Sequence, residues 1–170
     1  MDAATDLVIR PAREEDLAPA GALCVEVYVG EGHSKPDGPY AELLGDARRR
    51  SEEAELLVAL DPAGGPGAVL GCVTFAAGGN PWADIAEPHE GEIRMLAVAR
   101  AARGRGAGSA LVRAAMARSR ELGLTGMAFS TRPQMTAAHR VYERLGFRRT
   151  PERDWEPAPG IDVIVYSITF

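Results

Sequence analysis

The most informative segment of the chain is the glycine-rich run Arg103-Gly104-Arg105-Gly106-Ala107-Gly108-Ser109. It follows a strand-like run that ends Leu96-Ala97-Val98, and it opens a run with apolar residues at helical spacing that extends to about Leu122. A turn between a strand and a helix exposes unpaired backbone N–H groups at the positive end of the helix dipole, and glycine lets a ligand approach that backbone closely. The segment therefore predicts a binding site for a phosphate group.

Two familiar phosphate-binding motifs do not fit this segment. A dinucleotide-binding fingerprint needs a third glycine where Ser109 stands and an acidic residue at the end of the next strand, where residues 127–131 have none. A P-loop needs a lysine after its last glycine, and the only lysine in the chain is Lys35. What remains is the pattern Arg-or-Gln, x, x, Gly, x, Gly-or-Ala, filled here by Arg103, Gly106 and Gly108.

With this pattern in place, the sequence resembles the GNAT-type N-acetyltransferase superfamily. The run EIRMLAVARAARGRGAGSALV (92–112) looks like its fourth strand, pyrophosphate loop and following helix, and AAHRVYERLGF (137–147) looks like its last helix and the turn into the next strand. The close match covers residues 92–147, and the order of elements extends it more loosely to the whole chain. The resemblance implies that acetyl-CoA is the co-substrate and that its acetyl group passes directly to a primary amine.

The resemblance also implies which residues contact acetyl-CoA. Backbone groups of Leu96 and Val98, with Ala97 between them, are implied to pair with the pantetheine arm, and the N–H groups of residues 103–109 to hold the pyrophosphate. Many members of the family carry asparagine seven residues before the tyrosine of the last helix. This chain has Met135 there, so that side-chain contact is not expected.

Glu92 is the candidate general base. An alkylamine with a pKa of about 10.4 is neutral in only about one molecule in two thousand at pH 7, so its attack on a thioester needs a base or a water relay. Strand alternation places Glu92 on the same face as Leu96 and Val98. An exposed acid at the strand end, or one paired with Arg94, remains an open alternative. The other candidates for this base lie in the adjacent loop: Glu87, His89 and Glu90.

Tyr142 is the candidate general acid. A departing thiolate with a pKa of about 8.5 benefits from a proton donor, and the tyrosine of YERLGF stands where the family usually keeps its general acid. A buried ring that only packs beneath the sheet is the alternative. His139 lies one helical turn earlier on the same side, so it could line the cofactor groove, and a cap or surface histidine is an equal alternative.

Charge is unevenly distributed along the chain. The net charge is -5 at pH 7, yet residues 94–149 carry twelve arginines and two acids. This partition predicts that the arginine-rich part binds an anion while the rest keeps the protein soluble, although arginines on exposed helices are the alternative. Nucleic acid fits poorly, because the chain is acidic overall and shows no recognised nucleic-acid module. The acidic N-terminal half weakly favours a cationic acceptor through electrostatic steering.

The cysteines and the N-terminus indicate a compartment. Cys24 and Cys72 have neither CxxC nor paired spacing, so we expect buried, reduced thiols without a disulfide framework or a metal site. The N-terminus lacks the basic start and apolar core of a signal peptide, and no apolar run reaches membrane-spanning length. These features predict a cytoplasmic protein without a membrane partner.

The periodicity of the whole chain predicts one domain over residues 1–170, of class α/β (α+β). The expected order is β-α-α-β-β-β-α-β-α-β-β, which predicts a mixed sheet. The resemblance implies that this is a GNAT-like mixed central sheet of about six to seven strands with helices on both faces. The expected strands are residues 7–10, 56–60, 69–75, 92–98, 127–130, 147–149 and 161–170, and the expected helices are residues 14–29, 40–53, 107–122 and 135–145. The expected loops 30–39, 76–89 and 150–160 carry no motif that identifies the acceptor.

Three functions remain open at this point. The leading one is an acetyl-CoA-dependent N-acetyltransferase that acts on the primary amine of a small molecule. The alternatives are an acetyltransferase for protein N-termini or lysines, and a non-catalytic acyl-CoA-binding module. The expected partners are a coenzyme A thioester and an amine acceptor, and a homodimer is compatible with the sequence.

Overall fold

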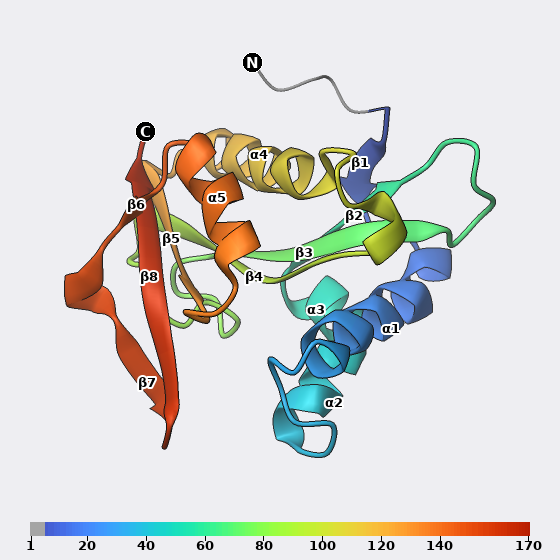
Figure 1. Cartoon of the computed structure of the whole chain (residues 1–170). Coiled ribbons are helices and arrows are strands. Elements are labelled where there is room, and N and C mark those ends of the chain that lie inside the picture. The colour runs from blue at the N-terminus through green and yellow to red at the C-terminus, as the bar shows by residue number, and fades with distance from the viewer. Residues whose placement is uncertain (1–5) are drawn as a thin grey trace.

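The computed structural model describes residues 6–170, and it arranges them as one mixed sheet of eight strands flanked by five α-helices (Figure 1). The strands are β1 (Val8–Pro11), β2 (Glu55–Leu60), β3 (Val69–Ala77), β4 (Glu90–Val98), β5 (Gly126–Thr131), β6 (Arg148–Arg149), β7 (Trp155–Ala158) and β8 (Ile161–Thr169). The helices are α1 (Glu14–Gly30), α2 (Pro39–Gly45), α3 (Ala47–Glu53), α4 (Ala107–Glu121) and α5 (Thr136–Arg144). The signal-peptide expectation rests partly on residues 1–5, which lie outside the described chain.

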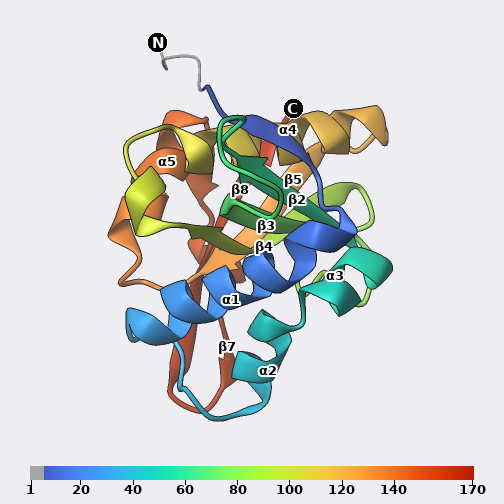
Figure 2. The same cartoon turned by 90° about the vertical axis from the view of Figure 1, so that its right-hand side faces the viewer.

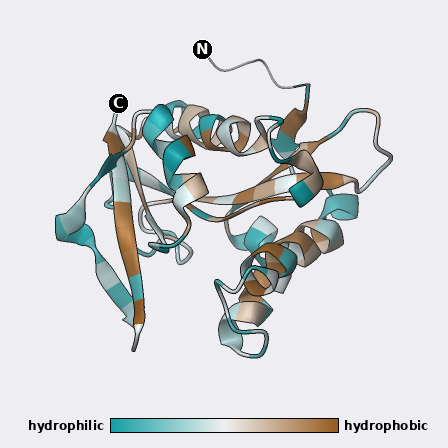
Figure 3. Ribbon diagram, in the orientation of Figure 1, coloured by the Kyte–Doolittle hydropathy of each residue, from teal (hydrophilic) through white to brown (hydrophobic). Residues whose placement is uncertain are grey.

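The sheet runs in the order β1-β2-β3-β4-β5-β8-β6, with β7 paired to β8, and helices cover both of its faces (Figures 1 and 2). Helices α1, α2 and α3 pack on one face, where Leu23 and Leu44 join a buried apolar cluster with Met95. Helices α4 and α5 cover the other face, where Leu111 and Tyr142 belong to a second cluster. Figure 3 shows α1 and the middle of β8 as largely hydrophobic and α5 as mostly hydrophilic. Each helix thus buries apolar area against the sheet, which is the main stabilising contribution.

The predicted mixed sheet with helices on both faces is confirmed, with two differences in detail. The expected helix 40–53 is broken, because α2 ends at Gly45 and the Asp46 side chain caps α3 by accepting a hydrogen bond from the Arg49 N–H at 3.1 Å. Residues 150–160 are not a plain connection, because β7 forms within them and pairs with β8. The sheet therefore has one strand more than the expected order allows.

Strands β4 and β5 are parallel and are joined only at their first residues. Within the described chain their ladder pairs Glu90 with Gly126 and Gly91 with Met127, and then stops. The second half of β4 is therefore left without a ladder partner on this side. Since buried N–H and C=O groups need hydrogen-bond partners, the divergence offers a place where an extended ligand can pair with β4.

A bulge interrupts β4 beside this divergence. Strand β3 advances from Thr74 to Cys72 while β4 advances from Arg94 to Ala97, so β4 carries one extra residue. Met95 within this segment has a φ of 54°, a conformation that residues other than glycine rarely adopt. Such a local distortion is common next to functional sites.

The bulge corrects one expectation from the sequence. Ile93 packs in the cluster beneath α4, whereas Met95 lies in the cluster beneath α1, although strict alternation would place both on one face. Glu92 consequently faces the α1 side, and Leu96 and Val98 pack on the α4 side. The expectation that these three residues share a face is wrong, because the extra residue reverses the alternation.

Cys24 of α1 and Cys72 of β3 are both buried and free, as the sequence predicts, and their sulfur atoms lie 3.4 Å apart. The fully buried Arg50 donates to the Leu44 carbonyl oxygen at 2.9 Å and to the Cys24 sulfur at 3.5 Å. The hydrogen bond with Cys72 lowers the pKa of Cys24, burial opposes this shift, and the Arg50 charge adds to it. These contacts tie α1 to β3 and to α3.

Candidate functional site

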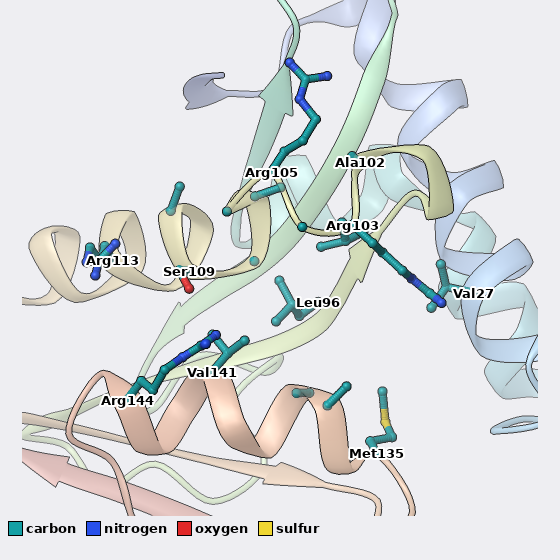
Figure 4. A pocket seen from close by; sticks show the side chains of 18 of the residues that line it. Val27, Leu96, Ala102, Arg103, Arg105, Ser109, Arg113, Met135, Val141 and Arg144 are labelled. Carbon is teal, nitrogen blue, oxygen red and sulfur yellow. The ribbon is translucent and has the colours of Figure 1, made fainter. Parts of the chain in front are cut away.

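A groove with a cavity volume of about 1240 Å³ opens beside the second half of β4, between α4 and α5 (Figure 4). It brings together the strand residues and the glycine-rich loop that the sequence singles out. The predicted residues that line it are Leu96, Val98, Arg103, Gly104, Arg105, Gly106, Ala107, Gly108 and Ser109. The predicted phosphate loop and the unpaired part of β4 therefore belong to one cavity.

Two left-handed glycines shape the loop before α4. Gly104 has a φ of 85° and Gly106 a φ of 79°, a region that glycine enters at little cost and other residues avoid. Gly106 is the N-cap of α4 and contributes no capping side chain. The N–H groups of the first turn, residues 107–109, therefore have neither a helical nor a capping partner and can bind an anion.

Ion pairs fix this loop to the rest of the molecule. Arg103 pairs with Glu31 beyond the end of α1 at 2.6 Å, and Arg105 pairs with Asp61 beyond the end of β2 at 3.1 Å. Arg144 of α5 also lines the groove, and Figure 4 shows its side chain extending into the space between α5 and α4. The groove lining as a whole contains four arginines and two acidic residues, and this surplus of positive charge suits a polyanionic ligand.

Several groove residues were not anticipated from the sequence. Ala137, Val141 and Arg144 of α5 line it at i, i+4 and i+7, so they form one stripe of that helix. Arg113 lines it from α4. This spacing is the signal that could have identified the α5 residues, because His139 falls on the neighbouring stripe.

The prediction that His139 lines the cofactor groove is wrong, because His139 is not among the residues that line it. It lies on the buried face of α5, where its Nε2 lies 3.1 Å from the carbonyl oxygen of Arg132 and its ring packs on Tyr166. Burial lowers the pKa of His139, with the Arg132 carbonyl opposing the shift. Ala97 also does not line the groove, since the bulge places its side chain in the cluster on the α1 side.

A second cavity, of about 820 Å³, lies beside the bulge and shares His33, Leu96 and Met135 with the groove. The loop between α1 and α2, strands β4 and β5, and the β7–β8 hairpin supply its walls. Both candidate catalytic residues, Glu92 and Tyr142, line this cavity. The two cavities therefore meet beside Leu96. A ligand that extends along β4 in the groove would place one end at this junction.

Glu92 is held rigidly in the second cavity. Its side chain is 1% exposed, and its Oε1 accepts hydrogen bonds from the N–H groups of Ile85 at 2.8 Å and Ala86 at 2.9 Å. Burial raises the pKa of Glu92, and the backbone hydrogen bonds oppose that shift. Arg94, its alternative partner, pairs instead with Asp84 at 3.5 Å. Glu92 is thus an oriented carboxylate with a raised pKa, as a general base requires.

The three other candidates for the base lie outside both cavities. Glu87 and His89 are exposed. Glu90 is buried, but it pairs with Arg153 at 3.0 Å. Burial alone would raise the pKa of Glu90, and this pairing holds it below its ordinary value. Among the four candidates, the geometry therefore favours Glu92.

Tyr142 has a packed ring and is one of the residues that line the second cavity. Its side chain is 5% exposed, and its ring meets Phe129 edge-on with the centroids 4.4 Å apart. Within residues 6–170 its hydroxyl makes no hydrogen bond. Burial raises the pKa of Tyr142 well above its ordinary range, so the phenol stays protonated at neutral pH. Both interpretations of this tyrosine, packing and proton donation, are compatible with its position.

The second cavity carries both signs of charge. Its acidic side chains are Asp37, Asp84 and Glu92, and its basic side chains are Lys35, Arg94 and Arg132. Although the N-terminal half of the chain is acidic, the cavity itself does not favour a purely cationic acceptor.

Residues 6–170 contain neither a candidate metal site nor a candidate membrane-spanning helix. No group of three or more histidine, cysteine or acidic side chains is gathered in a way that could hold a metal ion. No helix there has both the length and the apolar character that crossing a bilayer demands.

Several solved structures with the same fold are described as acetyltransferases. An acetyltransferase of the GNAT family from Staphylococcus aureus Mu50 has a TM-score of 0.74 and 14% identity, with 96% of this chain and 98% of that chain covered. A GCN5-related N-acetyltransferase from Kribbella flavida has a TM-score of 0.70 and 24% identity over 97% and 98% of the two chains. The yncA protein of Salmonella typhimurium, solved with its cofactor acetyl-CoA, has a TM-score of 0.69 and 19% identity over 96% and 94%.

The family assignment rests on the sequence itself. No curated protein sequence matches the chain closely enough to count as a relative. Residues 22–147, however, match the family described as Acetyltransferase (GNAT) family, and they include the glycine-rich loop, the β4 bulge and α5. The chain therefore belongs to the GNAT family of acetyltransferases.

Proposed function

We propose that residues 1–170 form one acetyl-CoA-dependent N-acetyltransferase domain that transfers the acetyl group directly to the primary amine of a small molecule. One observation carries the proposal: the groove and the second cavity meet at the β4 bulge, and Glu92 and Tyr142 both line the second cavity. The free, buried Cys24 and Cys72 fit a reducing compartment such as the cytoplasm.

In this proposal the groove binds acetyl-CoA. The N–H groups of residues 107–109 receive the pyrophosphate, with the positive end of the α4 dipole behind them. Backbone groups of Leu96 and Val98, which have no ladder partner on this side, pair with the pantetheine arm. That alignment directs the thioester along β4 toward the second cavity.

The chemistry then follows from the two side chains. The amine nitrogen bonds to the thioester carbon and the carbon–sulfur bond breaks, giving an amide and coenzyme A. The Glu92 carboxylate accepts the proton that the amine loses, and the Tyr142 hydroxyl donates its proton to the departing sulfur. Water then carries the proton from Glu92 to the tyrosinate, so both side chains return to their starting state.

The enclosure of the second cavity by the α1–α2 loop and the β7–β8 hairpin favours a small acceptor over a protein segment. A panel of small amines, peptides with free N-termini and lysine peptides, each incubated with acetyl-CoA, tests this by thiol release and product mass. We expect coenzyme A to be released, and an acetylated product to form, when a small amine is present. Release with peptides alone would favour the protein-acetylating alternative, and binding of acetyl-CoA without release would favour a non-catalytic module.

Gly106→Val should weaken acetyl-CoA binding by about tenfold or more, because a β-branched residue in a left-handed conformation costs about 1 to 2 kcal/mol and moves the start of α4. Calorimetric titration with acetyl-CoA measures the effect, and Gly106→Ala provides a milder variant should valine impair folding. Gly65→Val is the matched control, because Gly65 lies in an exposed turn with open space around its Cα and no left-handed strain. Equal affinities for Gly106→Val and Gly65→Val would contradict the placement of the pyrophosphate.

A further inference from the structure

Arg132 is a cation that lines the second cavity and has one N–H group without a hydrogen-bond partner. It follows β5 directly and lines the cavity, where its NH1 group donates to the His33 carbonyl oxygen at 3.2 Å. Its Nε is buried and has no hydrogen-bond partner, and Arg132 forms no ion pair with any residue in 6–170. A guanidinium group carries a positive charge, so this cavity contains a cation that forms no ion pair within residues 6–170.

The other cations near the site are already satisfied. Arg94 pairs with Asp84 and its guanidinium lies over the Trp82 ring, 5.7 Å from the centroid. Lys35 is exposed, so water solvates its ammonium group. Arg132 differs because its buried Nε has no hydrogen-bond partner, and a buried donor left unpaired is unfavourable.

The backbone of Arg132 is anchored as a ligand-binding residue requires. Its carbonyl oxygen lies 3.1 Å from the Nε2 of the buried His139 and accepts the N–H of Met135 at 3.1 Å. These contacts fix the backbone of Arg132 in the segment before α5. The hydrogen bond from its NH1 group to the His33 carbonyl oxygen restricts the side chain as well. A fixed fork of N–H groups matches the two oxygens of a carboxylate.

We propose that Arg132 forms an anion subsite for the acceptor, which is therefore an amine that carries a carboxylate, as an amino acid does. This inference rests on the proposed acetyl transfer at the same site. Glu92 supplies a carboxylate on β4 for the amino group, and Arg132 supplies the charge for the carboxylate from the end of β5. The two groups on separate strands of one cavity complement a zwitterion, and they select against an amine that lacks the anionic group.

Matched acceptors test the subsite. Leucine is compared with isoamylamine, and phenylalanine with phenethylamine, because each pair differs only in the carboxylate. We expect kcat/KM in the wild-type enzyme to favour at least one of the amino acids over its decarboxylated partner by about 30- to 100-fold, the effect of one charged hydrogen-bonded pair. Equal or better use of both decarboxylated amines would overturn the proposal.

The Arg132→Gln variant tests whether Arg132 causes the preference for the amino acid over the decarboxylated amine. We expect the KM for the amino acid to rise by about 30-fold or more, the KM for acetyl-CoA to stay within a few-fold, and the preference over the decarboxylated amine to vanish. Lys35→Gln, which removes a charge from the exposed part of the same cavity, should keep the preference. A rise in the KM for acetyl-CoA, with the preference intact, would show that Arg132 serves the coenzyme and would overturn the assignment.

A binding experiment tests the anion subsite independently of acetyl transfer. N-acetyl-leucine and N-acetyl-phenylalanine are titrated calorimetrically into the protein saturated with coenzyme A, and into the Arg132→Gln variant. Binding of either one by the wild type, weakened at least about tenfold in the variant, would support the subsite even if no amine were acetylated. If neither product binds, or if both proteins bind it equally, the subsite is refuted whatever the outcome for acetyl transfer.

Discussion

Replacing Glu92 by glutamine should lower turnover at neutral pH by about 10² to 10⁴, the usual contribution of one general base. The amide keeps the size of the carboxylate and its Oε1 can still accept the N–H groups of Ile85 and Ala86, so the fold has no reason to change. Initial rates with saturating acetyl-CoA and a competent amine measure the effect. The melting temperature of the same variant should be unchanged or slightly higher, because a buried charge is removed.

The dependence of turnover on pH should also differ between the wild type and Glu92→Gln. Burial raises the pKa of Glu92, and only its deprotonated form accepts a proton, so wild-type turnover should rise as the pH increases through that pKa. Glutamine does not titrate, so this rise should be absent from the variant. At high pH the amine loses its own proton, and the difference between variant and wild type should narrow.

Glu87→Gln is the matched control for Glu92→Gln. It makes the same chemical change on an exposed residue of the neighbouring loop that lines neither cavity. We expect it to retain wild-type turnover. Unchanged turnover for Glu92→Gln at neutral pH would move the base role to a water relay or to another residue.

Tyr142→Phe should reduce turnover by about 10²-fold while acetyl-CoA affinity stays within a few-fold, because the hydroxyl acts only as sulfur departs and the ring still fills the same volume. The hydroxyl makes no hydrogen bond to residues 6–170, so its loss should cost little stability. Rate, affinity and melting temperature are measured on the same preparation. A variant with full turnover would leave Tyr142 as a packing residue.

Tyr166→Phe provides the contrast within the same aromatic cluster. The Tyr166 ring lies 5.9 Å from the Tyr142 ring, and its hydroxyl donates to the Glu143 carboxylate at 3.0 Å. Its removal should cost about 1 kcal/mol of stability, the usual worth of one hydrogen bond, without a specific effect on turnover. Losses of turnover of equal size in both variants would indicate a general disturbance of the cluster.

The parts of the site that depend on local backbone chemistry could be predicted from the sequence. Gly104 and Gly106 adopt left-handed conformations that follow from the residue type, and the first turn of α4 lacks intrahelical partners in any helix. The loop and the strand before it were therefore found without knowledge of the fold.

The relation between Glu92 and the groove could not be predicted in the same way. The segment EIRMLAV has no glycine or proline to signal a bulge, and the bulge exists only in the pairing of β4 with β3. Alternation therefore predicted the wrong face for Glu92. Its place in the second cavity depends on the distortion at Met95 and on the loop of Ile85 and Ala86, which no local pattern contains.

Arg132 and β7 escaped prediction because their roles are defined by distant parts of the chain. Arg132 meets His33, which lies 99 residues away in sequence. Strand β7 contains Pro157 and is held by pairing with β8 and by the Trp155 Nε1 group, which donates to the Ser130 hydroxyl at 2.8 Å. A proline makes a short segment look unlike a strand, because it cannot donate a backbone hydrogen bond, although an edge strand tolerates it.

A crystal structure of the protein with acetyl-CoA would show whether the coenzyme occupies the groove with its thioester at the second cavity. We expect a pyrophosphate within hydrogen-bond distance, about 3 Å, of the N–H groups of residues 107–109, and a thioester sulfur about 3 to 3.5 Å from the Tyr142 hydroxyl. The thioester carbonyl should lie at the β4 bulge, open to the cavity that holds Glu92. A coenzyme bound away from the Arg103–Ser109 loop, or a sulfur outside reach of both Tyr142 and the second cavity, would contradict this placement of the coenzyme.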